Sequence, residues 1–290
     1  MLKGLCDLCD PGLNPGLNDE LSNRNRLMWI NKTVSLSKLL IIFLFLFILL
    51  VLSGCAGPKR DVLKGYEVYE PSELAVERYV VGKSVQGRAV EKIALGRGND
   101  VIFIIAGIHG CEPAGVGLVN GLVEHLRKES YLLFGRKVVI LPRANPDGLA
   151  ANRRFNARRV DLNRNFESAN RINNRRNGRR ALSEPESRII KNLIEEYRPG
   201  RIVSIHQPLN CIDYDGPGEE LAIRMSEYCD LPVEKVGARP GSLGSYAGEE
   251  LGIGIITLEL RKDDTWLDEQ LLWERYGMSL LAAVVYPARP

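Results

Sequence analysis

The chain has 290 residues, 45% of them hydrophobic and 26% charged, which is an ordinary composition for a globular protein. Its formal net charge of +3 is too small to indicate binding to nucleic acid. We therefore expect a folded domain that has no nucleic-acid partner.

The N-terminal region is predicted to direct export. Residues 39–52 form an unbroken apolar run of 14 residues, preceded by Lys32 and Lys38. This run is short for the roughly 30 Å hydrocarbon core of a bilayer and is typical of a signal peptide. The LSGC sequence that ends at Cys55 resembles the bacterial lipobox, in which the cysteine is lipidated. A simple membrane anchor is the alternative. Both interpretations predict an exported domain held at the membrane, and lipidation predicts that it faces the periplasm.

Residues 1–27 are an unusually long polar leader for a signal peptide, so we expect translation to start at Met28. This interpretation divides the chain into three parts. Residues 1–54 are the leader and signal peptide, residues 55–75 are a linker, and residues 76–290 are one catalytic domain.

Strand-like and helix-like segments alternate through this domain. Residues 79–96 predict a hairpin or two short edge strands. Further strands are predicted over 101–106, 138–142, 201–206 and 253–260. Helices are predicted over 114–128, 184–197, 219–228 and 266–285, with Ser183 as the N-cap of the second. The alternation predicts a single α/β domain with a mixed, mostly parallel central sheet flanked by helices.

Two of the three histidines stand where a catalytic zinc ion would need them. His109 follows the strand at 101–106 and is followed three residues later by Glu112, and His206 ends the strand at 201–206. Ligand sites of open α/β sheets lie beyond the carboxyl ends of strands, so these groups can meet at one edge. Catalytic zinc typically takes three nitrogen or oxygen ligands from the protein and keeps one position for water. The pattern predicts one zinc ion.

Other titratable residues have simpler interpretations. His125 lies within a predicted helix among apolar residues and is not expected to bind metal. Cys111 is expected to be a small buried side chain, because a thiol nucleophile would need a dedicated histidine partner. With Cys211 and Cys229 it makes three thiols, so at least one stays unpaired if disulfides form.

Glu259 lies inside an apolar strand. A buried carboxylate costs several kcal/mol unless it is paired, metal-bound or close to neutral. Glu259 is therefore a candidate general base. The alternative is a surface ion pair with Arg261 or Lys262.

Residues 153–180 hold ten arginines and two acids. The stretch is either a solvated loop or an anion-attracting rim suited to a substrate with several carboxylates. Arginine can stabilise an oxyanion or bind a carboxylate through two hydrogen bonds, and the pattern alone leaves both roles open.

Five motifs occur in a fixed order along the chain. They are His109-x-x-Glu112, Asn145-Pro146-Asp147-Gly148, the VDLNRNF sequence at 160–166, His206 and Thr257-Leu258-Glu259-Leu260. Together they resemble the zinc carboxypeptidase family of the carboxypeptidase A type over residues 76–285. Segments at 183–186, 204–213 and 240–246 are most similar to the family's murein peptide amidase branch.

The resemblance implies a role for each matching residue. His109, Glu112 and His206 would bind zinc, and Glu259 would be the general base acting on zinc-activated water. Asn163 and Arg164 would bind the terminal carboxylate of the substrate. Arg154 would stabilise the oxyanion, with Arg153 as the alternative.

The implied substrate is a peptidoglycan-derived peptide, cleaved at the γ-D-glutamyl–meso-diaminopimelate bond. The chain departs from the branch in its expected export and in the arginine-rich segment 168–180. Val236 falls about where carboxypeptidase A has a tyrosine, and Tyr246 is a candidate for lining the pocket. Two other functions remain open: a deacylase of the aspartoacylase or succinylglutamate desuccinylase type, and an inactive peptidoglycan-binding lipoprotein.

Overall fold

The structure, a computed structural model, describes residues 76–287. The strands of its sheet are β1 (Glu77–Lys83), β2 (Ala89–Leu95), β3 (Asp100–Ile105), β4 (Arg136–Leu141), β5 (Arg201–His206), β6 (Leu209–Asp215) and β7 (Gly254–Arg261). The helices are α2 (Ala114–Lys128), α3 (Pro146–Ala150), α4 (Pro185–Tyr197), α5 (Glu219–Ser226) and α6 (Glu269–Val285). Short helical segments are η1 (Ser130–Leu133), η2 (Leu162–Arg164), η3 (Gly244–Glu250) and η4 (Lys262–Trp266).

The expectations for the signal peptide, the start at Met28, the linker and the lipidated Cys55 lie outside the described residues. In the described part of the chain, no helix is both long enough and apolar enough to span a membrane.

The sheet has seven strands in the order β1-β2-β4-β3-β5-β7-β6. The four strands β4, β3, β5 and β7 are parallel to one another, and β2 and β6 join them antiparallel on the two sides. Every residue of β5 is buried. Such continuous burial is expected of a parallel strand covered on both faces and explains its largely apolar sequence. The predicted fold class is confirmed.

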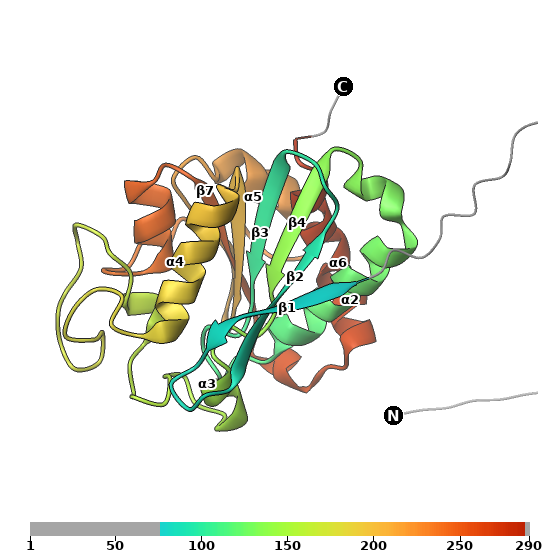
Figure 1. Cartoon of the computed structure of the whole chain (residues 1–290). Helices are drawn as coiled ribbons and strands as arrows, with labels where there is room; N and C mark the ends of the chain where they lie inside the picture. The colour runs from blue at the N-terminus through green and yellow to red at the C-terminus, as the bar shows by residue number, and fades with distance from the viewer. Residues whose placement is uncertain (1–75, 288–290) are drawn as a thin grey trace, which may run out of the picture. The chain divides into compact units, whose positions relative to one another are not determined.

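Helices cover both faces of this sheet. α2, α5 and α6 bury their apolar residues in one cluster, and α4 and η3 bury theirs in another. Figure 1 shows the separation clearly, with α4 on one side of the strands and α2 and α6 on the other.

The connections create a switch point between β3 and β5. From β3 the chain passes through α2 to β4, its neighbour on one side. From β4 it passes through α4 to β5, which pairs with β3 on the opposite side, with Ile105 level with Ser204. Crevices outside the carboxyl ends of strands at such a point are the usual ligand sites of open α/β sheets.

Most of the predicted elements are present, with small shifts at their ends. The predicted N-cap Ser183 is wrong. Glu184 occupies that position in extended backbone, with Pro185 in the first turn, and the Ser183 hydroxyl donates to the Glu184 carboxylate at 2.8 Å. Sequence reasoning also missed strand β6, whose polar residues obscure the apolar pattern of a strand.

Candidate active site

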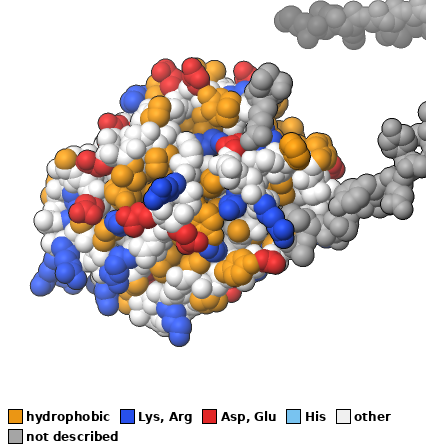
Figure 2. All heavy atoms as spheres, turned by 45° about the horizontal axis from the view of Figure 1, so that its top comes forward, with side chains coloured by type: hydrophobic (Ala, Val, Ile, Leu, Met, Phe, Trp, Pro, Cys, Tyr) orange, Lys and Arg blue, Asp and Glu red, His pale blue; other side chains and the backbone are white. Residues whose placement is uncertain are grey.

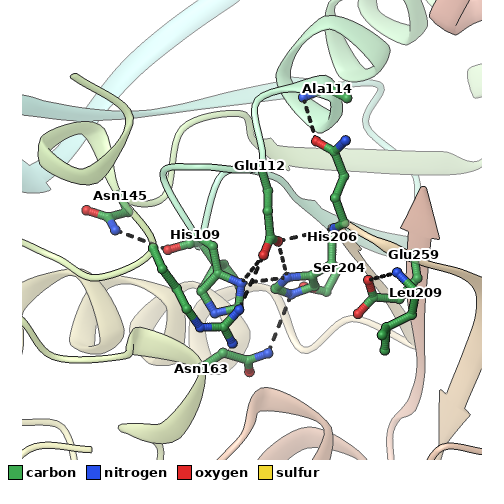
Figure 3. A network of polar contacts seen from close by, with 12 residues as sticks. His109, Glu112, Ala114, Asn145, Asn163, Ser204, His206, Leu209 and Glu259 are labelled. Atoms are coloured by element: carbon green, nitrogen blue, oxygen red, sulfur yellow. Dashed lines mark hydrogen bonds and ion pairs between the residues drawn. The ribbon is translucent and has the colours of Figure 1, made fainter. Parts of the chain in front are cut away.

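Three side chains from two neighbouring strand ends converge at the switch point. Nδ1 of His109 lies 2.9 Å from Glu112 Oε1, and Nδ1 of His206 lies 2.9 Å from Glu112 Oε2. The two Nδ1 atoms are 3.2 Å apart. All three side chains are buried, and Figure 3 shows them pointing toward one another.

These donors fit a zinc ion. A tetrahedral centre with bonds of about 2.0–2.1 Å places its ligand atoms about 3.3–3.4 Å apart, close to the spacings seen here. Two imidazole nitrogens and a carboxylate are also a common ligand set of catalytic zinc. The group formed by His109, Glu112 and His206 can therefore hold a metal ion, as their spacing in the sequence predicts.

The far side of each imidazole ring has its own partner. His109 Nε2 lies 3.0 Å from Asp161 Oδ1. His206 Nε2 lies 3.0 Å from Ser204 Oγ and 3.5 Å from Asn163 Nδ2. Such partners fix the orientation of a metal-binding histidine and leave its other nitrogen facing the metal.

Sequence reasoning gave neither Asp161 nor Ser204 a role. The available signal for Ser204 was its position two residues before His206, which places both side chains on the same face of β5. For Asp161 there was only its place within the VDLNRNF motif.

The two acids of the centre are ionised at neutral pH. Burial opposes the ionisation of Glu112, but hydrogen bonds with His109 and His206 lower its pKa to about 2. Burial likewise opposes the ionisation of Asp161. The hydrogen bond with His109 and the positive charge of Arg154 nevertheless hold the Asp161 pKa well below its usual range. The centre thus concentrates negative charge where a cation would bind.

Glu259 lies beside this centre on β7 and is 9% exposed. Its Oε2 accepts a hydrogen bond from the Leu209 backbone N–H at 3.2 Å. Burial raises its pKa, and the nearby His206 opposes that rise. Within residues 76–287 no ion pair joins Glu259 to Arg261 or Lys262, and Arg261 Nε donates to Asn210 Oδ1 at 3.1 Å.

A cavity of about 400 Å³ opens over these groups. Its polar lining includes the three metal-binding candidates and Glu259, together with Arg154, Asn163, Arg164, Asp213, Asp215 and Arg239. The structure thus brings together in one cavity the predicted metal-binding residues, Glu259, Arg154, Asn163 and Arg164, but not Arg153 or Tyr246.

The structure separates the two adjacent arginines. Arg154 Nε donates to Asp161 Oδ2 at 3.0 Å, and its Nη1 lies 3.4 Å from Glu112 Oε1. Arg153 is exposed and does not line the cavity. Of the two, Arg154 is the one that can face a substrate.

Asn163 and Arg164 form one wall. Asn163 Oδ1 accepts from the Leu243 backbone N–H at 2.8 Å, and Arg164 donates to the Asn163 carbonyl. Burial lowers the pKa of Arg164, and the charge of Asp161 opposes this effect. The guanidinium is therefore partly stripped of water before any anion arrives.

Cys111 is exposed, so its predicted burial is wrong, and burial of part of the thiol together with the charge of Glu112 raises its pKa. Tyr246 is buried against Phe166, with ring centroids 5.9 Å apart, and does not line the cavity, whereas Val236 does. His125 packs against Trp273, away from the metal-binding candidates.

The arginine-rich segment is partly structural. One guanidinium nitrogen of Arg171 donates to the backbone carbonyls of Asn177, Gly178 and Arg180 at 2.7–3.0 Å. Four other arginines of the segment are exposed: Arg175, Arg176, Arg179 and Arg180. Figure 2 shows basic side chains gathered along the lower left of the molecule, the side on which Figure 1 draws this loop.

Comparisons with known proteins agree with this geometry. Residues 70–214 match the family model described as zinc carboxypeptidase. Murein peptide amidase A of Escherichia coli K12 is 35% identical over 175 residues, covering 54% of this chain and 69% of the relative. The Vibrio campbellii protein of the same name is 31% identical over 198 residues, covering 62% and 77%.

Solved structures show the same fold. Murein-tripeptide amidase from Escherichia coli O157 superposes with a TM-score of 0.60 at 25% identity, covering 76% of this chain and 97% of that one. Carboxypeptidase A from Helicoverpa armigera gives a TM-score of 0.63 at 22% identity, covering 74% and 70%. The family also accounts for the zinc that the donor set fits. The chain is a hydrolase and belongs to the zinc carboxypeptidase family.

Proposed function

We propose that this protein is a zinc-dependent amidase that hydrolyses the γ-D-glutamyl–meso-diaminopimelate bond of peptidoglycan stem peptides. One observation carries the proposal: the metal-binding candidates, Glu259 and the arginines open into one cavity of about 400 Å³. The names of the bacterial relatives, murein peptide amidases, supply the substrate class.

When bound, zinc would lower the pKa of water and polarise the scissile carbonyl. Glu259 would take the proton from the attacking water and later deliver it to the leaving amine. Burial suits it to both tasks, because its raised pKa lies closer to neutrality than that of an exposed carboxyl. The Leu209 N–H holds one oxygen of this carboxylate in place.

Arg154 would stabilise negative charge on the carbonyl oxygen during attack. Its guanidinium lies at the cavity wall and is held at Nε by Asp161. A donor fixed in this way loses little energy to reorganisation during the reaction.

Asn163 and Arg164 would hold the terminal carboxylate of the substrate. A guanidinium offers two parallel donors to a carboxylate, and partial burial strengthens that pairing. Arg239 at the rim and the exposed arginines of the 168–180 segment would attract a peptide that carries several carboxylates.

The zinc-loaded protein should be incubated with L-Ala-γ-D-Glu-meso-diaminopimelate and the products identified by mass. Release of free diaminopimelate is the expected result. An intact peptide, together with cleavage of N-acyl amino acids, would assign the protein to the deacylases instead. No hydrolysis of either substrate would favour a binding lipoprotein.

We also propose that the domain is exported and attached to the membrane through a lipid on Cys55. The support is the apolar run at 39–52 and the lipobox-like sequence that follows it. Labelling cells with a radioactive fatty acid should mark the wild-type protein but not Cys55→Ala. Equal labelling of the wild type and Cys55→Ala would contradict the proposal.

A further inference from the structure

Strand β6 brings two aspartates into the cavity. In the antiparallel pairing with β7, Asp213 is level with Thr257 and Asp215 with Ile255, and all four residues line the cavity. Glu259 is four residues from Ile255 on β7, which corresponds to about 13 Å along a strand. Asp215 therefore lies at the far end of the cavity from the catalytic groups.

Asp215 is buried without a full set of partners. It is 2% exposed, and its Oδ1 has no hydrogen-bond partner among the described residues. The Asp215 carboxylate accepts a backbone hydrogen bond from Ala238, which leaves Oδ1 unpaired, and Asp213 accepts from the Val236 backbone N–H at 2.8 Å. A buried carboxylate that lacks a partner is costly, and such groups normally bind a cation or a donor.

The surrounding fold makes room for this carboxylate. A Cβ added to Gly244 would lie 2.0 Å from Asp215 Oδ2, and one added to Gly248 would lie 2.7 Å from Asp215 Cβ. These glycines of η3 let the Asp215 side chain lie against the helix backbone. Packing therefore fixes the direction in which the carboxylate points.

The lining of the cavity carries both positive and negative side chains. Arg154 and Arg164 line the walls with the metal-binding candidates, Asp213 and Asp215 line the part formed by β6, and the exposed Arg239 is the third cation of the lining. Lys235, a cation on the neighbouring connection, places its ammonium over the Tyr214 ring, 4.7 Å from the centroid. Tyr214 alternates with the two aspartates along β6, so its side chain points to the other face of the sheet.

This arrangement fits a residue that has a carboxylate at one end and an ammonium group at the end of a long side chain. We propose that Asp215 binds the side-chain ammonium of the amino acid released by hydrolysis, and so selects a diamino acid at that position. The inference rests on the proposed function and names the group that recognises its substrate. Short or neutral side chains would leave Oδ1 of this buried carboxylate unpaired.

Binding of free amino acids to the zinc-loaded protein tests the assignment directly. Calorimetry should compare meso-diaminopimelate and L-lysine with L-norleucine, which matches lysine in length but has no ammonium group. The wild type should bind both diamino acids roughly 10- to 100-fold more tightly than norleucine. Asp215→Asn should lose that preference and keep its affinity for norleucine.

Glu249→Gln is the matched control. Glu249 is exposed on η3, and its charge acts on Asp215, but it does not line the cavity. This variant should keep the wild-type preference. The assignment would be overturned if the wild type showed no preference for the diamino acids, or if Asp215→Asn kept that preference. It would also be overturned if Asp215→Asn bound all three ligands more weakly by the same factor. Equal weakening would show a purely structural role.

Hydrolysis assays distinguish a wrong assignment of Asp215 from a wrong assignment of the cleaved bond. Peptides of the form L-Ala-γ-D-Glu-X and N-acyl-X should be compared, with X as diaminopimelate, lysine or norleucine. If only N-acyl-X is cleaved and Asp215→Asn loses its preference for lysine, the proposed bond is wrong and the assignment of Asp215 stands. If γ-D-Glu-X is cleaved with the same selectivity by wild type and variant, the assignment is wrong and the proposed function stands.

Discussion

Glu259 is the registered neighbour of His206 in the parallel pairing of β7 with β5. Residues level with each other on adjacent strands face the same side of a sheet, so the proposed base and a metal-binding candidate share one cavity. The pairing fixes their separation through backbone hydrogen bonds rather than through a flexible loop. Functional groups held by such elements are positioned more accurately than groups held on loops.

Replacing Glu259 should separate metal binding from catalysis. Glu259→Gln should keep zinc and reduce kcat/KM by roughly 10²- to 10⁴-fold, because it removes the proton acceptor and leaves the ligands intact. His109→Ala should lose both zinc and activity. Metal content measured beside kcat/KM checks this, with the exposed Glu91→Gln as the control. An active Glu259→Gln variant would show that another group is the base.

The partners behind the histidines should control zinc affinity. Asp161→Asn should weaken zinc binding by roughly 10- to 100-fold, because the His109 ring would lose its charged partner. Ser204→Ala should weaken it less, since Asn163 also lies near His206 Nε2. Competition with a chelator measures both. Unchanged affinity in Asp161→Asn would mean that packing alone orients His109.

Replacement of the two adjacent arginines should have very different effects on kcat. Arg154→Ala should lower kcat by roughly 10²- to 10³-fold, the usual cost of removing an oxyanion donor. Arg153→Ala should be close to wild type, because its side chain is exposed outside the cavity. Steady-state kinetics with equal zinc loading makes the comparison. Similar losses in both variants would contradict the assignment of Arg154.

Arg164 should matter only for substrates with a free terminal carboxylate. Arg164→Gln should reduce kcat/KM on the free acid by roughly 10- to 100-fold, since a charged hydrogen-bonding partner is lost. Cleavage of the matching C-terminal amide should change little, which makes the amide an internal control. Arg175→Gln, an exposed change of the same kind, should leave both rates unaltered. Equal effects on acid and amide would point to a structural role.

Discrimination between lysine and norleucine should depend on pH. Burial, together with the charges of Asp213 and Glu249, raises the pKa of Asp215 to about 6, and Lys235 opposes the rise. Only the ionised carboxylate attracts an ammonium group. The preference should therefore be constant above about pH 7 and fall by up to about tenfold per unit as the pH drops through 6.

Binding of the two amino acids between pH 5 and 8 measures this dependence. Norleucine corrects for any titration that affects both ligands. In Asp215→Asn the ratio of the two affinities should be flat across the range. A wild-type ratio that does not fall in acid would show that Asp215 is not the titrating partner.

The sequence alone predicts those parts of the fold in which one physical signal dominates. The strand that ends at His206 is largely apolar because both its faces are covered, and its predicted limits are confirmed. The three metal-binding candidates followed from placing polar residues at the ends of such strands, and the structure brings them together.

The remaining features depend on tertiary contacts. Strand β6 was missed because Asp213 and Asp215 replace apolar residues on the face that lines the cavity. Cys111 follows a buried histidine, yet its own side chain is exposed, and only the path of the loop decides this. The path of the loop also decides that Arg153 is exposed while Arg154 lines the cavity.

The switch point has a consequence for how the chain matures. His109 and Glu112 leave β3 early in the chain, but His206 comes only with β5, after two crossovers have been completed. A shorter fragment lacks the third donor, so the free energy of zinc binding becomes available only once the centre of the sheet has assembled. Zinc therefore stabilises only chains in which the centre of the sheet has formed. A chain that stalls before β5 would gain no stabilisation from zinc and would remain open to proteolysis.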